Sequence, residues 1–395
     1  MLPVLFARVS GWLALATITA AALFLGLPLL VSLVSLASLA SLASACGLSE
    51  SAGDSLDDGG PPSGRASVAP LPVSGRDPDA DVAEGDGTAG AGPFVPYEAG
   101  LPVAGQVGAD GGALSRLLFA VVGDSRPATV DDTNGYPAHV VATLFGDIAA
   151  LRPRPPMVLS TGDYVFASAS RASRASPAGG SGQAAPQLDV YLQARARFPG
   201  AFFPAMGNHE CTGATNSNCG AGSSSGEPPN YAAFVDKMLA PIGEAAPYYA
   251  IDVVALDAAW SAKLVFVAAN AWSSAQEAWL ESTMARPSTY TFVVRHEPAT
   301  ADAAPGVTPS EAIMARHPYT LAIVGHSHTY RHDAARPREV LIGNGGAPLS
   351  SKDYGFGVFS QRSNGVIDVD MLDWQTARAD ASFHFAVKPD GAATP

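Results

Sequence analysis

Apolar runs that end in a polar residue recur along most of the chain, and their length and β-branched content are typical of buried strands. These runs lie at 116–124, 156–163, 201–210, 262–270, 290–298 and 319–328. Segments with helical patterning separate several of them, at 137–151, 230–239 and 274–285, and beyond Arg338 strands dominate the pattern. Ser274, with Glu277 three residues later, has the pattern of a capping box that begins the last of these helices. This order predicts a layered α/β domain with helices outside the sheets.

The first 46 residues have the pattern of an export signal. Arg8 is the only charged residue among the first ten, and none occurs from Gly11 to Ala45, a stretch long enough to cross a bilayer as a helix. The stretch ends in small residues directly before Cys46, which resembles a bacterial lipoprotein signal peptide, although Ala43 stands where that pattern usually has leucine. An uncleaved membrane anchor and a simple secretion signal are the alternatives. We therefore expect an exported cell-envelope protein, which an N-terminal lipid or anchor would attach to the membrane.

Residues 47–113 are rich in Gly, Pro, Asp, Ser and Ala and contain few aromatic residues. Such a segment buries too little apolar surface to offset the loss of chain entropy on folding, so we expect a disordered tether there. The folded unit is then expected over 114–395, which is long enough for a single α/β domain. Within it, Cys211 and Cys219 lie eight positions apart and are expected to form a disulfide in an exported protein, the alternative being two separate thiols.

The overall charge limits the kinds of ligand. With 36 acidic residues against 23 Lys and Arg, the formal net charge is −13 at pH 7, so nucleic acid is not expected as a partner. A small phosphorylated substrate remains compatible with this charge, because bound metal ions invert the local potential.

Side chains with metal-binding atoms follow the predicted strands. They are Asp124, Asp163, Asn208, His209, His296, His326 and His328. In open α/β sheets, ligands gather outside the carboxyl ends of the strands. Carboxylate, amide and imidazole donors suit divalent Zn, Mn or Fe, and there are more of them than one ion needs. The sequence therefore predicts two divalent metal ions that share a bridging carboxylate.

The motifs that carry these residues resemble those of the calcineurin-like metallophosphoesterase superfamily. The matching segments, in the family's order, are GDSR (123–126), GDYV (162–165), GNHE (207–210), the histidine of VVRHEP (296) and GHSHTY (325–330). The resemblance implies two packed mixed β-sheets flanked by helices. It also implies that a metal-activated hydroxide at a dinuclear site hydrolyses a phosphomonoester or a phosphodiester.

The resemblance further implies a role for each site residue. Asp163 would bridge both metals, Asp124 and His328 would hold the first, and Asn208, His296 and His326 would hold the second. His209 would lie beside the metals and either protonate the leaving alcohol or orient the phosphate, which suits a side chain whose pKa lies near neutrality. Glu210 is expected to stabilise this loop or the orientation of His209.

Arg126 departs from the family's first motif, which usually has a histidine ligand at that position. Arginine has no lone pair to donate, so it cannot replace the imidazole. The purple acid phosphatase branch also lacks this histidine but has a tyrosine ligand three residues after the bridging aspartate. That position is Phe166 in this chain, and Tyr164 is expected to point away from the metals.

Three roles for Arg126 are compatible with the sequence. It would contact the substrate phosphate through its bidentate fork. Alternatively, it would form an ion pair with a nearby carboxylate such as Asp131 or Asp132. In the third case it would mark a weakened first metal site, and the chain would be an envelope-tethered binding protein with a degenerate, inactive phosphoesterase fold.

Overall fold

The computed structural model describes residues 102–170, 182–220, 227–350 and 352–394. The predicted signal peptide or anchor (1–46) and most of the predicted tether (47–113) lie outside the described residues. Within the described ranges, no helix is both long and apolar enough to cross a membrane.

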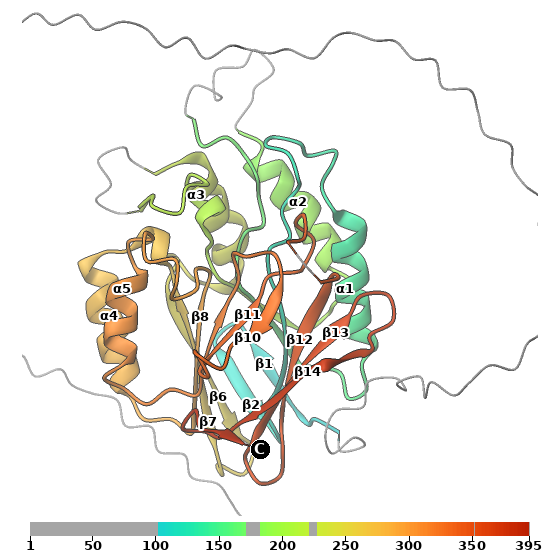
Figure 1. Ribbon diagram of the computed structural model, residues 1–395, viewed down its shortest axis with the longest axis vertical. Coiled ribbons are helices and arrows are strands. Elements are labelled where there is room, and N and C mark those ends of the chain that lie inside the picture. Colours follow the sequence, from blue (N-terminus) through green and yellow to red (C-terminus); the bar gives the residue numbers. More distant parts are fainter. Residues whose placement is uncertain (1–101, 171–181, 221–226, 351, 395) are drawn as a thin grey trace, which may run out of the picture. The chain divides into compact units, whose positions relative to one another are not determined.

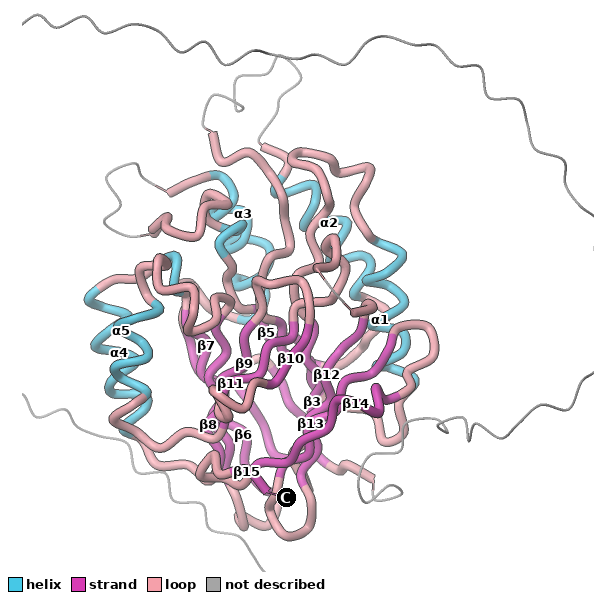
Figure 2. The backbone as a smooth tube through the Cα atoms, in the orientation of Figure 1, coloured by secondary structure: helices cyan, strands magenta, loops and turns pink. Residues whose placement is uncertain are grey.

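Two β-sheets form the centre of the domain (Figures 1 and 2). The eight-stranded sheet has the spatial order β1 (Gly105–Gly108), β2 (Gly111–Leu114), β6 (Tyr249–Ala255), β7 (Ser261–Val267), β8 (Tyr290–Arg295), β9 (Leu321–Val324), β11 (Glu339–Ile342) and β10 (Tyr330–His332). The seven-stranded sheet has the order β15 (Ala393–Thr394), β14 (Ala379–Val387), β13 (Ile367–Asp373), β12 (Gly355–Gln361), β3 (Leu118–Val122), β4 (Met157–Ser160) and β5 (Ala201–Pro204). Both sheets are mixed, because β3, β4 and β5 pair in parallel, as do β7, β8 and β9, while other pairs are antiparallel.

Helices cover the outer faces of the two sheets. They are α1 (Ala138–Ala150), α2 (Ala184–Arg195), α3 (Pro229–Phe234), α4 (Ser274–Ala285) and α5 (Val307–Met314). Figure 1 shows α1 and α2 on one flank of the sheets and α4 and α5 on the other. The predicted architecture of two packed mixed sheets flanked by helices is confirmed.

The core follows from the alternation of side chains along each strand. In β7, Leu264 and Phe266 belong to the main core, whereas Val265 and Val267 pack in a second cluster with residues of α4 and α5. Between the sheets, the Phe119 ring of β3 stacks on Phe359 at 4.6 Å and meets Phe292 of the other sheet edge-on at 5.2 Å, measured between ring centroids. Strands buried on both faces account for the continuous apolar runs in the sequence.

The expected start of the folded domain at residue 114 is wrong. Strands β1 and β2 pair as an antiparallel hairpin, and β2 also pairs in parallel with β6, so the domain includes residues from the region predicted to be a tether. The sequence GQVG of β1 and GGAL of β2 has little apolar content. These strands are held in place by backbone pairing with β6. Because β6 lies more than a hundred residues later in the chain, no local sequence pattern indicates this pairing.

Two helices, α2 and α5, were not predicted from the sequence, and in each of them a polar side chain interrupts a mainly apolar buried face. In α2, the fully buried Gln187 exchanges hydrogen bonds with the backbone of Phe166. In α5, the fully buried Ser310 accepts a hydrogen bond from the Arg295 guanidinium at 2.7 Å. Helix α4 is present as predicted, but its N-cap is Ser273, which accepts from the Gln276 backbone N–H, and not Ser274.

Candidate metal centre

The predicted site residues meet at the carboxyl ends of the parallel strands of both sheets. Asp124, Asp163 and Asn208 follow β3, β4 and β5, and His296 and His326 follow β8 and β9. Backbone hydrogen bonds join the strand ends within each sheet, from Asp124 N–H to the Gly162 carbonyl (3.0 Å) and from Gly325 N–H to the His296 carbonyl (2.8 Å). The sheets are also joined to each other, because His296 Nδ1 lies 2.9 Å from the Thr161 carbonyl oxygen.

The backbone at this edge is strained. Asp124, Asp163, His326 and His328 have φ angles of 57°, 58°, 75° and 37°, in the left-handed region that non-glycine residues rarely adopt. Such conformations persist where surrounding contacts enforce them, and they concentrate at functional sites. Four of the six predicted ligands therefore have a backbone conformation that is unfavourable for a non-glycine residue.

Glycines beside the carboxylates allow this close packing. Gly162, which precedes Asp163, has a φ of 107°, and a side chain there would be strained. A Cβ on Gly207 would clash with Asp163 Oδ1, so that only glycine lets the two loops approach. These contacts explain the glycines of the second GD motif and of the GNHE motif.

Four atoms with lone pairs converge in a set that we call the second-metal group, made of Asp163, Asn208, His296 and His326. His296 Nε2 lies 3.1 Å from Asn208 Oδ1 and 3.3 Å from Asp163 Oδ1, and His326 Nδ1 lies 3.1 Å from the same amide oxygen and 3.2 Å from His296 Nε2.

The hydrogen bonds behind these atoms set their orientation. His296 Nδ1 faces the Thr161 carbonyl, so that nitrogen carries a proton and Nε2 points into the group. The Asn208 amide donates from Nδ2 to the Gly213 carbonyl at 2.5 Å, which turns its oxygen inward. Oxygen and nitrogen acceptors at these separations repel one another unless a proton or a cation lies between them. The donor set therefore fits a divalent metal ion of the Zn, Mn or Fe type.

A second cluster, the first-metal group, consists of Asp124, Asp163 and His328, each of which offers one ligand atom within 4.8 Å of the others. His328 Nε2 lies 3.7 Å from Asp124 Oδ1, while its Nδ1 lies 2.7 Å from the Pro348 carbonyl oxygen and so carries the proton. The structure thus brings all six predicted ligands together, with Asp163 common to both groups. That they bind metal stays a prediction.

Charges at the centre compensate one another. Burial alone would raise the pKa of Asp163, but the neighbouring His296, His209 and Arg126 hold it below its usual range. Burial would lower the pKa of His296, yet Asp163 and Asp124 raise it well above the ordinary value. In the metal-free chain a proton on His296 therefore supplies positive charge where a metal ion would supply it. Burial lowers the pKa of His326 to about 4, so its imidazole is neutral and can act as a ligand at neutral pH.

His209 lies beside the metal groups and outside both. Its Nε2 is 3.9 Å from Asp163 Oδ2, and its ring meets Phe166 edge-on with 4.8 Å between centroids. Burial is the main cause that lowers the pKa of His209 to about 4. A neutral imidazole with an N–H at this position can donate to a phosphate oxygen.

Glu210 holds the loop that carries Asp163. Its buried carboxylate accepts hydrogen bonds from four backbone N–H groups, those of Gly207 (2.8 Å), Asp163 (2.9 Å), Tyr164 (2.8 Å) and Val165 (3.3 Å). This agrees with the expected role in stabilising the loop. Because these bonds fix the turn at Asp163, Glu210 sets the position of the carboxylate that both metal groups share.

The two aromatic residues at the second motif, Tyr164 and Phe166, point in different directions. Tyr164 points away from the metals into the core, where its ring lies 4.9 Å from that of Tyr191 and 6.1 Å from that of Phe234. Phe166 instead faces the site and contacts both Arg126 and His209. These contacts of Phe166 were not predicted from the sequence, because a phenylalanine after a strand has no distinguishing pattern.

Cys211 and Cys219 form the predicted disulfide. The bridged loop is tied to the metal centre through Gly213, whose N–H donates to the Asn208 carbonyl at 2.8 Å and whose own carbonyl orients the Asn208 amide. At its other end, Cys219 N–H donates to the Asn270 carbonyl at 2.8 Å. The loop therefore links Asn208 to the segment that follows β7.

We expect replacement of both cysteines by serine to lower the free energy of unfolding by about 2 kcal/mol, because the unfolded chain regains the entropy of an open loop. Affinity for metal is expected to fall as well, because the Asn208 amide loses its fixed partner. Urea unfolding and metal titration of the variant measure both effects. Adding reductant should shift the wild-type midpoint and leave that of the variant unchanged, and an unchanged wild-type midpoint would contradict the expectation.

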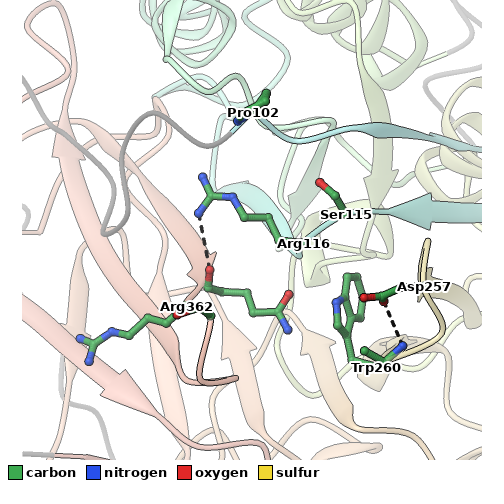
Figure 3. A pocket seen from close by; sticks show the side chains of 9 residues that line it. Pro102, Ser115, Arg116, Asp257, Trp260 and Arg362 are labelled. Carbon is green, nitrogen blue, oxygen red and sulfur yellow. Dashed lines mark hydrogen bonds between the residues drawn. The ribbon is translucent and has the colours of Figure 1, made fainter.

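The domain has a further cavity of about 390 Å³, and Figure 3 shows the side chains that line it. Arg116, Trp260 and Arg362 are among the residues that line it. Arg116 precedes β3, whereas Asp124 follows that strand, so the cavity and the metal centre lie at opposite ends of β3. The two regions are separate.

Comparison with known proteins places the central part of the chain in a family. The family model of the calcineurin-like phosphoesterases matches residues 117–330, which include all the predicted site residues. Among curated proteins, no significant match is found.

Two solved structures match the chain at low sequence identity. A purple acid phosphatase from yellow lupin (Lupinus luteus) seeds matches with a TM-score of 0.47 and 14% identity, over 70% of this chain and 54% of the other. A 5'-nucleotidase from Candida albicans matches with a TM-score of 0.37 and 10% identity, over 73% of this chain and 53% of the other. The chain thus matches about half the length of each of these structures.

Proposed function

The chain belongs to the calcineurin-like phosphoesterase family, and we propose that it is a metal-dependent phosphoesterase that hydrolyses a small phosphomonoester or phosphodiester. The observation that carries the proposal is the second-metal group. Asp163 Oδ1, Asn208 Oδ1, His296 Nε2 and His326 Nδ1 converge, and hydrogen bonds outside the group turn these atoms inward. A divalent cation would balance these acceptors, a role that a proton on His296 fills in the metal-free chain.

We infer a dinuclear site of two divalent ions, because Asp163 belongs to both groups of donors. Bound there, divalent ions would supply the positive charge that a phosphoryl group requires and would lower the pKa of a water molecule. The protein's own contribution is rigidity. Glu210 fixes Asp163, Gly213 fixes Asn208, and Thr161 fixes His296.

His209 and Arg126 are the proposed catalytic residues beside the metals. The neutral His209 would donate an N–H to a phosphate oxygen and orient the substrate. Protonation of the leaving alcohol would need His209 as an imidazolium. An approaching phosphate dianion favours that form, because its negative charge raises the pKa of a neighbouring histidine. The Arg126 side chain is 15% exposed, and its guanidinium would contact the phosphoryl group through charge-assisted hydrogen bonds.

A panel of p-nitrophenyl phosphate and bis-p-nitrophenyl phosphate, supplied to the protein with Mn, Zn or Fe, tests the proposal and separates monoesterase from diesterase activity. Turnover that disappears in the Asp163→Asn variant would support an enzyme. The alternative is an envelope-tethered binding protein with an inactive phosphoesterase fold. Substrate binding without turnover under all three metals would support that alternative.

We also propose that the protein is exported and held at the membrane through Cys46 or an N-terminal anchor, on the strength of the apolar segment before Cys46. Fractionation of cells that express the wild-type and Cys46→Ser proteins tests this. A lipoprotein loses acylation and membrane association in the variant. An uncleaved anchor keeps the variant in the membrane, and recovery of the wild type from the cytoplasm would contradict export.

A further inference from the structure

Arg126 is directed at the carboxylate that the two metal groups share. Its Nε lies 3.7 Å from Asp163 Oδ2, and its Cζ lies 4.6 Å from the centre of the Phe166 ring. The predicted pairing with Asp131 or Asp132 is not found. Asp131 instead accepts a hydrogen bond from the Ser168 N–H, and Asp132 accepts one from the Gly135 N–H, at 2.8 Å each. The acidic partner of Arg126 is therefore Asp163.

The guanidinium is held at this place. Phe166, on which it stacks, is itself anchored by its backbone, because its N–H donates to Gln187 Oε1 at 2.7 Å and its carbonyl accepts from the Asp131 N–H at 2.8 Å. Arg126 Nη1 also donates to the Pro127 carbonyl at 3.3 Å. A stacked and hydrogen-bonded guanidinium loses little further entropy in staying beside Asp163.

The two oxygens of Asp163 consequently differ in their surroundings. Oδ1 lies 3.3 Å from His296 Nε2 in the second-metal group, whereas Oδ2 faces Arg126 at 3.7 Å. The second-metal group has four protein donors. The first-metal group has three, and it has a permanent cation at the edge where the family usually has a histidine ligand.

We propose that Arg126 makes the two metal positions unequal, so that one divalent ion binds tightly in the second-metal group and the other binds weakly in the first-metal group. The inference rests on the proposed function, because it concerns the same centre. Two causes act together: the missing imidazole removes a donor, and the guanidinium repels an incoming cation at short range. Arg126 then balances the charge of Asp163 whenever the weak position is empty.

The test is a titration of the chelator-stripped full-length protein with Mn²⁺. Calorimetry and electron paramagnetic resonance monitor the binding of the metal ions. The wild type should bind one ion per chain tightly and a second one at least about tenfold more weakly, a difference of the size that neighbouring groups impose on metal sites. After the first equivalent, the resonance spectrum should be that of an isolated Mn²⁺. The spectrum of a coupled pair should appear only with excess metal.

Two substitutions separate the causes. Arg126→Gln removes the charge and should tighten the second binding step, and Arg126→His removes the charge, adds an imidazole and should tighten it further. Arg316→Gln is the matched control, because Arg316 is an exposed arginine paired with Glu281, and it should leave both steps unchanged.

Two ions bound with equal affinity in the wild type would overturn the proposal. So would a weak step that Arg126→Gln leaves unaltered, since the guanidinium would then have no influence on it. A wild type that binds no metal at all would contradict the proposed function instead. The two failures are therefore distinguishable.

Discussion

The His209→Ala variant is expected to lose turnover by at least about a hundredfold while it retains the metal content of the wild type. The reason is the position of the side chain. His209 Nε2 approaches Asp163 Oδ2 only to 3.9 Å, and the ring packs edge-on against Phe166 outside both groups of predicted ligands. Steady-state kinetics and elemental analysis of the purified variant measure the two quantities separately.

A matched histidine serves as the control. His384 is half-exposed on β14, where its Nδ1 lies 2.8 Å from Asp370 Oδ1, and His384→Ala should change neither turnover nor metal content. Loss of bound metal in the His209→Ala protein would show that His209 is a ligand. Retained turnover would show that the substrate is oriented by other groups, with Arg126 the first to examine.

The Glu210→Ala variant is expected to lower the free energy of unfolding by roughly 4 kcal/mol or more, because buried backbone donors each cost about 1–3 kcal/mol when left without an acceptor. Four such donors surround the Glu210 carboxylate. Since two of them belong to Gly207 and Asp163, affinity for metal should fall together with stability. Urea unfolding and metal titration are the measurements.

Glu277, an exposed residue in the first turn of α4, offers the comparison. Glu277→Ala should leave the unfolding midpoint close to that of the wild type. Glu210→Gln should lie between the two, because the amide keeps one acceptor oxygen and turns its NH₂ toward backbone donors. A Glu210→Ala protein as stable as the Glu277→Ala protein would contradict the role assigned to the carboxylate.

The functional expectations depend on a small number of residues whose sequence context is distinctive. Asp124, Asp163 and Asn208 each follow an apolar run, and parallel strands place their carboxyl ends at one edge. That edge could be predicted because strand patterning is local and the geometry of parallel sheets is general. That Tyr164 points away from the metals was also predicted, from its place where a strand passes into a loop, whereas its packing in the core was not.

Other features required contacts between distant segments. Strands β1 and β2 contain too few apolar residues to be recognised, and they are ordered by pairing with β6. In α2 and α5, the polar residues Gln187 and Ser310 can be buried because they form hydrogen bonds with the backbone of Phe166 and with Arg295. In each case the partner lies elsewhere in the chain, so a pattern confined to the segment cannot reveal it.

For Arg126, the sequence determined one property and the tertiary structure determined another. The sequence alone established that a cation replaces an expected ligand, because side-chain chemistry is a property of the residue type and arginine has no lone pair. Which carboxylate the cation faces was a matter of tertiary structure. Asp131 and Asp132 are near in sequence, but the turn after β3 directs the guanidinium across to Asp163, where Phe166 supports it. Chemical capacity is encoded residue by residue, whereas the choice of partner depends on how folded segments approach one another.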